Sequence, residues 1–235
     1  MVKTEKPNCK ECPVRYRSIM RDLEPHLLDQ LHEQKHCNKY EKGDVIFHEN
    51  NFPMGLFAVY SGKVKIYKTN EYGKEQIIRL ARPGDPLGYR SLISGDTYQA
   101  TAAVLETSRI CFIPKTMFSN LMQTSTKLFS RIIEVLSDDL KLAETRISAL
   151  ATKTVRERTA EALIILKNYY GLEPDGITLS VQMSREDLAN MVGTATESLI
   201  RMLSEFKADK LIVLKEKKIQ LVNIPKLQMV ANMQD

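Results

Sequence analysis

The chain has 235 residues, of which 43% are hydrophobic and 27% are charged, and its formal net charge is +5. This balance is typical of a globular protein with one large or two small domains, and it excludes collagen-like, low-complexity and disordered chains. The sequence has neither a long apolar run nor an apolar N-terminal stretch, so we expect no membrane-spanning helix, no signal peptide and a cytoplasmic location. Four cysteines are too few for a disulfide scaffold, and we expect them to be thiols or metal ligands.

The N-terminal half divides into an arm and a β-rich domain. Residues 1–39 are polar and contain Cys9 and Cys12, followed by an amphipathic helical pattern over residues 23–31. Residues 40–115 alternate short β-type runs with glycine turns. The runs are 45–47, 56–60, 64–67, 76–78, 102–105 and 110–113. This spacing predicts an antiparallel sandwich or barrel.

Residues 116–151 contain neither glycine nor proline, which favours one long helix. Apolar residues recur along it at alternating spacings of three and four, and they are Ile133, Leu136, Leu140, Ala143, Ile147 and Leu150. Such a narrow stripe on a long helix is typical of a seam between two chains. We therefore expect this helix to pair with a second copy, and packing against the chain's own domain is the alternative.

Residues 152–235 predict helices followed by a hairpin. The helical segments are 159–170, 184–192 and 196–207, with Gly193 between the last two, and the hairpin is 211–222. Ser184 and Asp187 have the spacing of a helix N-terminal cap. This order predicts a winged helix-turn-helix, and the whole chain is therefore of the α+β class.

The predicted helix over residues 196–207 has two distinct faces. Its apolar face consists of Leu199, Leu203 and Phe206. Its polar face consists of Glu197, Arg201 and Ser204, with Ile200 beside them. Such a helix fits the DNA major groove, where arginine bonds guanine and glutamate accepts from cytosine. Glu197 and Arg201 could instead form a surface ion pair, and Glu197 could cap the helix together with Thr194.

The segments 183–190, 192–193, 196–198 and 201–203 resemble the DNA-binding motif of the CRP/FNR superfamily of bacterial transcription regulators, and the resemblance extends over nearly the whole chain. It implies a β-roll sensor domain, a long dimerisation helix and a winged helix. It also implies a homodimer on a pseudo-palindromic operator in double-stranded DNA, with RNA polymerase as a further partner if the protein is an activator. Whether it activates or represses is left open by the sequence.

The resemblance assigns roles to residues of the DNA-binding segment. The set expected at the DNA is Ser184, Arg185, Thr196, Glu197, Ser198, Ile200 and Arg201. Glu197 would contact a cytosine and Arg201 a guanine in each half-site. The FNR branch has a serine where this chain has Ile200, and an apolar side chain there favours a thymine methyl group over a hydrogen bond.

The resemblance also bears on the signal. Cyclic-AMP receptors hold the ribose with a glutamate after a glycine and the phosphate with an Arg-Ser pair. This chain keeps Gly88 but has Tyr89 at the glutamate and Tyr98 with Gln99 at the Arg-Ser pair, while Arg90 lies at the wrong offset. We therefore expect an effector pocket formed by these residues that does not bind cyclic AMP.

The FNR branch implies an iron–sulfur cluster as an alternative sensor. Residues 105–114 resemble the segment that carries its internal cysteine, which corresponds to Cys111, and the Cys9 and Cys12 pair resembles the first two ligands. The third ligand position holds Ser18, so Cys37 would have to complete the set. The alternatives are a buried strand cysteine at Cys111 and a thiol pair in a flexible arm.

A haem-based or nitric-oxide-responsive sensor is a third alternative, with His26, His32, His36 and His48 or the cysteines as haem ligands. His32 and His36 could share a helix face, although two surface histidines explain the same spacing. With no bound cofactor as the default, we expect a regulator controlled through its sensor domain. The sequence lacks the common enzyme motifs, and a regulatory module that acts through protein partners is the remaining alternative.

Overall fold

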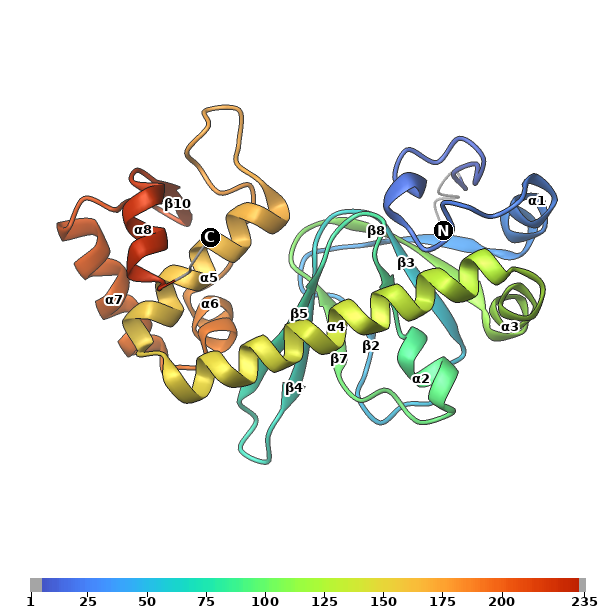
Figure 1. Cartoon of the computed structure of the whole chain (residues 1–235), viewed down its shortest axis with the longest axis horizontal. Helices are drawn as coiled ribbons and strands as arrows, with labels where there is room; N and C mark the ends of the chain where they lie inside the picture. Colours follow the sequence, from blue (N-terminus) through green and yellow to red (C-terminus); the bar gives the residue numbers. More distant parts are fainter. Residues whose placement is uncertain (1–5, 233–235) are drawn as a thin grey trace. The chain divides into compact units, whose positions relative to one another are not determined.

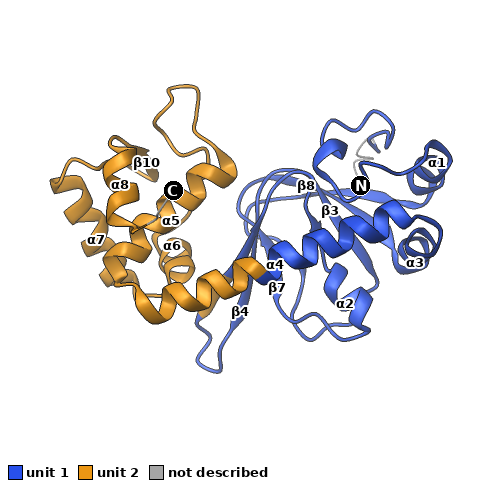
Figure 2. Ribbon diagram, viewed as in Figure 1, with its two compact units in different colours: residues 1–74, 78–140 blue, residues 75–77, 141–235 orange. Residues whose placement is uncertain are grey.

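The computed structural model describes residues 6–232 of the chain (Figure 1). The chain divides into two compact units, one of residues 1–74 and 78–140 and one of residues 75–77 and 141–235 (Figure 2). The division therefore falls inside the long helix, whereas the sequence placed a boundary after residue 151. None of the helices within residues 6–232 combines the length and the apolar character that a membrane crossing requires.

The first unit contains eight strands in two sheets among the described residues. The strands are β1 (His36–Tyr40), β2 (Val45–Phe47), β3 (Gly55–Ser61), β4 (Val64–Thr69), β5 (Glu75–Ala81), β6 (Pro86–Leu87), β7 (Thr101–Val104) and β8 (Ser108–Pro114). One sheet has the order β1-β8-β3-β6 and the other β2-β7-β4-β5. Strand β8 pairs antiparallel with β1 and β3, and β7 with β2 and β4. All six predicted strands form, and β1 and β6 are additional.

The helices of this unit pack beside the first sheet and continue into the long helix. They are the 3-10 turn η1 (Arg15–Arg17), α1 (Pro25–Gln34), α2 (Tyr89–Ser94), α3 (Lys115–Thr124) and α4 (Thr126–Thr152). A hydrophobic cluster joins residues of α1, α3 and α4 with Leu56 and Ile113 of the sheet. The side chains that α1 contributes to this cluster are Leu27, Leu28 and Leu31, which confirms the predicted amphipathic pattern.

The helix predicted over residues 116–151 is in fact two helices. Ser125 between them has an extended backbone, with φ −116° and ψ 103°. Its hydroxyl accepts a hydrogen bond from the Leu128 amide at 3.2 Å. A serine side chain that hydrogen-bonds an amide in the first turn of the next helix favours the end of the preceding helix. The helical segment is therefore interrupted at Ser125.

The second unit contains the predicted winged helix-turn-helix. Its elements are α5 (Val155–Tyr170), α6 (Arg185–Val192), α7 (Thr196–Ala208), β9 (Ile212–Lys215), β10 (Lys218–Leu221) and α8 (Ile224–Val230). Thr154 and Glu157 form a reciprocal capping box at the start of α5, and Gly171 ends that helix. The C-terminal helix α8 was not predicted from the sequence.

Candidate DNA-binding surface and sensor pocket

The turn between α6 and α7 is fixed at both ends of α6. The Ser184 hydroxyl accepts a hydrogen bond from the Asp187 amide at 2.9 Å, which confirms the predicted N-terminal cap. Gly193 ends the helix with φ 73° and ψ 50°, a left-handed conformation that glycine adopts without a Cβ clash. The two helices therefore meet at a defined turn.

Arg158 of α5 holds the end of α6 through two backbone carbonyls and bonds a third carbonyl in the segment before α5. Its Nε donates to the Val192 oxygen at 3.1 Å and its Nη2 to the Gly193 oxygen at 3.3 Å. Its Nη1 donates to the Lys153 oxygen at 2.7 Å. A guanidinium with five donors suits this position, because the last carbonyls of a helix lack partners within the helix.

A second arginine of α5 anchors α7. Arg156 bonds Glu205 at 2.8 Å and Asp209 at 2.6 Å, and its guanidinium lies 5.0 Å from the ring centroid of Phe206. Both acidic partners lie in or directly after the last turn of α7. Arg156 therefore fixes the C-terminal part of α7 and leaves the N-terminal part of the helix uncovered.

The packing face of α7 matches the prediction. Leu199, Met202, Leu203 and Phe206 are buried. On the other face Glu197, Arg201 and Ser204 are exposed, and Ile200 is 47% exposed. Nearly half of an isoleucine side chain in water on a polar face is a feature that the fold itself does not require.

The structure also tests the alternative roles of Glu197 and Arg201. The residue that caps α7 is Ala195, and no side chain caps the helix, so Glu197 does not form a capping box with Thr194. Among the described residues, neither Glu197 nor Arg201 takes part in an ion pair. The charges of both side chains are thus available for an external partner.

The other residues of the predicted DNA-binding set lie at the two helix starts. Thr196 and Ser198 are half-buried in the first turn of α7. Ser184 is exposed, but its hydroxyl is committed to Asp187 in the cap of α6. Burial lowers the pKa of the Arg185 guanidinium from its ordinary value, and arginine remains charged at neutral pH.

The hairpin adds two basic residues that sequence reasoning missed. Lys215 ends β9 and Lys217 lies in the turn before β10, and both are exposed. Lys218 in contrast bonds Glu173 at 2.8 Å. The signal in the sequence is the lysine-rich run 215–218 in the middle of the predicted hairpin.

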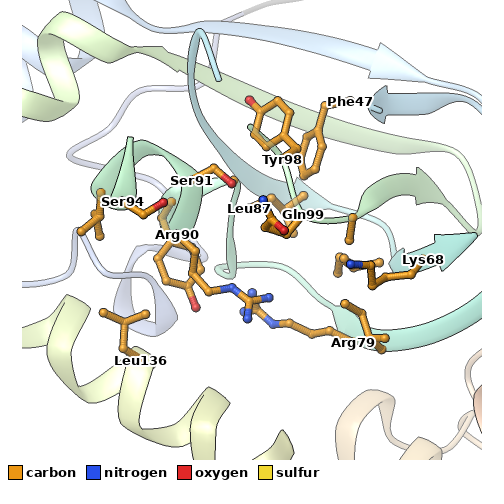
Figure 3. Close-up of a pocket in the computed structure, with 16 residues that line it drawn as sticks. Phe47, Lys68, Arg79, Leu87, Arg90, Ser91, Ser94, Tyr98, Gln99 and Leu136 are labelled. Carbon is orange, nitrogen blue, oxygen red and sulfur yellow. The ribbon is translucent and has the colours of Figure 1, made fainter. Parts of the chain in front are cut away.

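The first unit holds a cavity of about 440 Å³ between its strands, α2 and α4 (Figure 3). All five predicted pocket residues line it, and they are Gly88, Tyr89, Arg90, Tyr98 and Gln99. Residues that the sequence did not identify include Phe47, Lys68, Arg79 and Leu136. The lining has three basic side chains and no acidic one. Lys68 pairs with Glu49 at 3.2 Å and Arg79 with Asp139 at 3.4 Å, so among the described residues Arg90 is the basic lining residue without an ion pair, and it favours a negatively charged ligand.

Two aromatic rings form one wall of this cavity. Phe47 and Tyr98 stack with ring centroids 4.0 Å apart, as Figure 3 shows. Gly88 makes room for this arrangement, because a Cβ on it would lie 2.9 Å from a ring carbon of Tyr98. Burial raises the pKa of the Tyr98 hydroxyl to about 12, so it remains protonated at neutral pH.

Tyr89 links the cavity to α4. Its side chain is buried, and its hydroxyl donates a hydrogen bond to Asp139 of α4. Arg79 of β5 lies 3.4 Å from the same carboxylate, measured from Nε to Oδ1. Burial is the main cause that raises the pKa of Tyr89, and the hydrogen bond to Asp139 adds to it. The Asp139 carboxylate thus accepts a hydrogen bond from Tyr89 and pairs with Arg79, and both of these side chains line the pocket.

Two family models match the chain. The cyclic nucleotide-binding domain matches residues 37–125, and the Crp-like helix-turn-helix domain matches residues 157–230. The fumarate and nitrate reduction regulatory protein of Vibrio cholerae is 30% identical over 230 residues, which cover 95% of this chain and 90% of that relative. The chain belongs to the CRP/FNR family of transcription regulators.

Further comparisons agree with this assignment. Electron transport regulator A of Shewanella oneidensis is 31% identical over 226 residues, covering 95% of this chain and 90% of the relative. FixK2 from Bradyrhizobium japonicum has the same fold, with a TM-score of 0.76 at 22% identity over 86% of this chain and 99% of FixK2. A CRP/FNR regulator from Thermus thermophilus gives 0.72 at 24% identity over 85% of this chain and 100% of that chain. The similar proteins are regulators and not enzymes, as the sequence predicted.

The iron–sulfur hypothesis for this CRP/FNR regulator can be compared with the cysteine positions. Cys37 and Cys111 lie directly opposite each other on β1 and β8 and form a disulfide. Cys9 and Cys12 are free thiols. Within residues 6–232, no group of three or more His, Cys, Asp or Glu residues is arranged to hold a metal ion. The four cysteines as placed therefore do not fit a four-thiolate cluster, and the expectation that all four are thiols or metal ligands is corrected for Cys37 and Cys111.

The positions of the histidines do not support the haem alternative either. His32 lies in α1, which ends at Gln34, and His36 begins β1. The two histidines therefore do not share a helix face. His36 and His48 are both exposed.

The stripe on α4 is uncovered in the single chain. Ile133 is 48% exposed, Leu140 62%, Ile147 68% and Leu150 51%. Ala143 is also exposed, and Leu136 is half-buried because it reaches the sensor cavity. Phe129, at 52% exposure, continues the same spacing one step toward the N-terminus, and the sequence prediction did not include it.

Proposed function

We propose that this regulator binds a pseudo-palindromic operator as a homodimer formed along α4. The exposed a/d stripe supports pairing with a second copy, because a narrow apolar seam of alternating three and four spacing matches a coiled coil. A two-fold axis would place the two α7 helices on half-sites about one helical turn apart. Since its target is bacterial operator DNA, we place the protein in the cytoplasm, with RNA polymerase as a partner if it activates.

The observation that carries the DNA proposal is that Glu197 and Arg201 on the exposed face of α7 have no ion-pair partner among the described residues. Arg201 would donate both of its outer nitrogens to guanine, and Glu197 would accept from a cytosine amino group. Ile200 between them would contact a thymine methyl group. Lys215 and Lys217 of the hairpin would contact phosphates, which contributes affinity without sequence preference.

The test distinguishes contacts with particular bases from contacts with the phosphate backbone. Arg201→Ala should weaken operator binding by about 1–3 kcal/mol and relax discrimination at one base position of each half-site. Lys217→Ala should weaken binding to all sequences alike and make the salt dependence shallower. Both are measured by electrophoretic mobility shift on a randomised operator library. An Arg201→Ala variant that loses affinity equally on every sequence would contradict the assignment.

We propose further that the sensor cavity takes an organic anion with an apolar part and not cyclic AMP. Arg90 would supply the positive charge, because Lys68 and Arg79 are paired with Glu49 and Asp139, and the Phe47 and Tyr98 rings supply an apolar wall. Tyr89 stands where a cyclic-AMP receptor needs a carboxylate, and its hydroxyl is engaged by Asp139.

Two ligands test the pocket. Calorimetry with cyclic AMP should show no saturable binding. The fluorescent probe 1-anilinonaphthalene-8-sulfonate, an aromatic anion, should bind and should lose affinity in Arg90→Gln. The control is Arg109→Gln, because Arg109 is exposed on β8 and does not line the cavity. Equal probe affinity in the two variants would argue against this pocket.

A further inference from the structure

The four cysteines lie close together although they come from three separate segments. Cys9 and Cys12 belong to the N-terminal segment, Cys37 to β1 and Cys111 to β8. Cys9, Cys12 and Cys111 line one cavity of about 70 Å³, and Cys37 is bonded to Cys111. Two free thiols therefore share a cavity with one sulfur of a disulfide.

A buried cation lies at this cavity. Lys35 is 4% exposed and also lines it. Its Nζ donates to the Pro7 carbonyl at 2.6 Å and interacts with the Cys9 sulfur. Burial is the largest influence and raises the pKa of the Cys9 thiol above its ordinary value, and the charge and hydrogen bond of Lys35 offset part of this rise. A lysine beside a thiol stabilises the thiolate, which is the form that attacks a disulfide.

We propose that these four cysteines form a thiol–disulfide exchange site in place of a metal centre. The Cys9 thiolate attacks the Cys111 sulfur, so that a Cys9–Cys111 bond forms, the Cys37–Cys111 bond breaks and Cys37 leaves as a thiolate. The Cys12 thiolate then attacks the Cys9 sulfur and releases the Cys111 thiolate. The protons lost by Cys9 and Cys12 are taken up by Cys37 and Cys111, so the net change transfers one disulfide without any external oxidant.

The exchange site is connected to the helix that carries the exposed stripe. Cys9 belongs to the same hydrophobic cluster as Met117 of α3 and Ile132 of α4. Strand β8, which holds Cys111, runs directly into α3. Moving the disulfide from the β1–β8 pair to the N-terminal segment would therefore alter packing at the start of α4. This effect on DNA binding rests on the proposed function, whereas the exchange itself does not.

The experiment traps the intermediate in the full-length protein. Fully reduced protein receives one molar equivalent of oxidised glutathione, is quenched with iodoacetamide over time, and its disulfide-linked peptides are identified by mass spectrometry. In Cys12→Ser the second step is blocked, so the Cys9–Cys111 peptide should be enriched about tenfold over wild type. In the Cys12→Ser, Cys37→Ser double variant the same peptide should form directly, because neither competing thiol remains, which keeps the test valid if the single variant folds poorly.

Two lysine variants distinguish an effect on the reactivity of Cys9 from a general effect on protein stability. Lys35→Met should slow Cys9 alkylation and exchange about fivefold or more. Lys39→Met should leave both rates unchanged, because Lys39 is an exposed residue of β1 that pairs with Glu41. Circular dichroism confirms folding of each variant.

Three results would overturn the proposal. The first is Cys37–Cys111 as the sole linkage in both wild type and Cys12→Ser. The second is protein purified without oxygen that contains stoichiometric iron or zinc with all four cysteines protected from alkylation. The third is equal exchange rates in Lys35→Met and Lys39→Met. Because these readouts use no DNA, a failure here is distinguishable from a failure of operator binding.

Discussion

Truncation of the exposed stripe on α4 gives a direct test of the dimer. Leu140 is 62% exposed and Ile147 is 68% exposed in the single chain. Full burial of such a side chain is worth about 1.5–3 kcal/mol, so burying the exposed part contributes about 1 kcal/mol or more for each residue. Each residue occurs once in each subunit of a two-fold symmetric dimer, so each substitution removes two side chains from the interface. The Leu140→Ala, Ile147→Ala double variant should therefore weaken the dimer by about 4 kcal/mol, or about a thousandfold in Kd.

Sedimentation equilibrium across a range of protein concentrations measures this dissociation constant. The matched control is Leu142→Ala, because Leu142 lies on α4 at 38% exposure but outside the stripe. The circular dichroism spectrum at high protein concentration should stay unchanged, since neither side chain is part of the core of its own chain. A double variant with the dimer affinity of wild type would refute the assignment of this stripe.

Three further predictions concern single contacts. Tyr89→Phe removes the donor to the partly buried Asp139 carboxylate and should lower the free energy of unfolding by about 1–2 kcal/mol in urea titrations, and an unchanged midpoint would refute the link. Arg156→Met should lower the melting temperature modestly, since it loses two partly exposed ion pairs and the contact with Phe206, and operator affinity should fall with it. Hydrogen bonds from Thr178 hold the pKa of Asp175 at about 2, below its ordinary value of 3.8, so its contribution to stability is present above pH 3.8 and disappears as the pH falls toward 2. Asp175→Asn should therefore flatten the acid side of the stability curve, and an unaltered acid limb would contradict this role.

The elements that the sequence predicted well are those with a strong local pattern. Strand β4 alternates between buried and more exposed residues, β2 and β7 consist mainly of apolar residues, and glycines mark several of the turns between strands. The strand β1 was missed because its sequence, His36–Tyr40, is polar and has only Cys37 buried. Helix α2 has six residues between Gly88 and Gly95, which is too short for a periodic pattern.

Contacts between distant segments could not be predicted in this way. The disulfide depends on the register of β1 against β8, which places Cys37 opposite Cys111, and a shift of one residue would separate the two side chains. The hydrogen bond from Tyr89 to Asp139 likewise spans 50 residues. The exposed polar face of α7 was predictable because it depends on the periodicity of a single helix, whereas the anchoring of this helix by Arg156 of α5 was not.

Leu136 lines the sensor cavity and also belongs to the stripe on α4. Asp139 and Leu140 are adjacent on this helix, and Asp139 bonds Tyr89 of the cavity whereas Leu140 is part of the exposed stripe. Neighbouring residues of a helix point about 100° apart, so a rotation that improves the contact of Asp139 with the pocket also moves Leu140 against the partner subunit. In the proposed dimer, mutations that adapt the cavity to a new ligand would therefore change the fit between subunits as well. The proposed signal specificity and the proposed dimer interface would then evolve together.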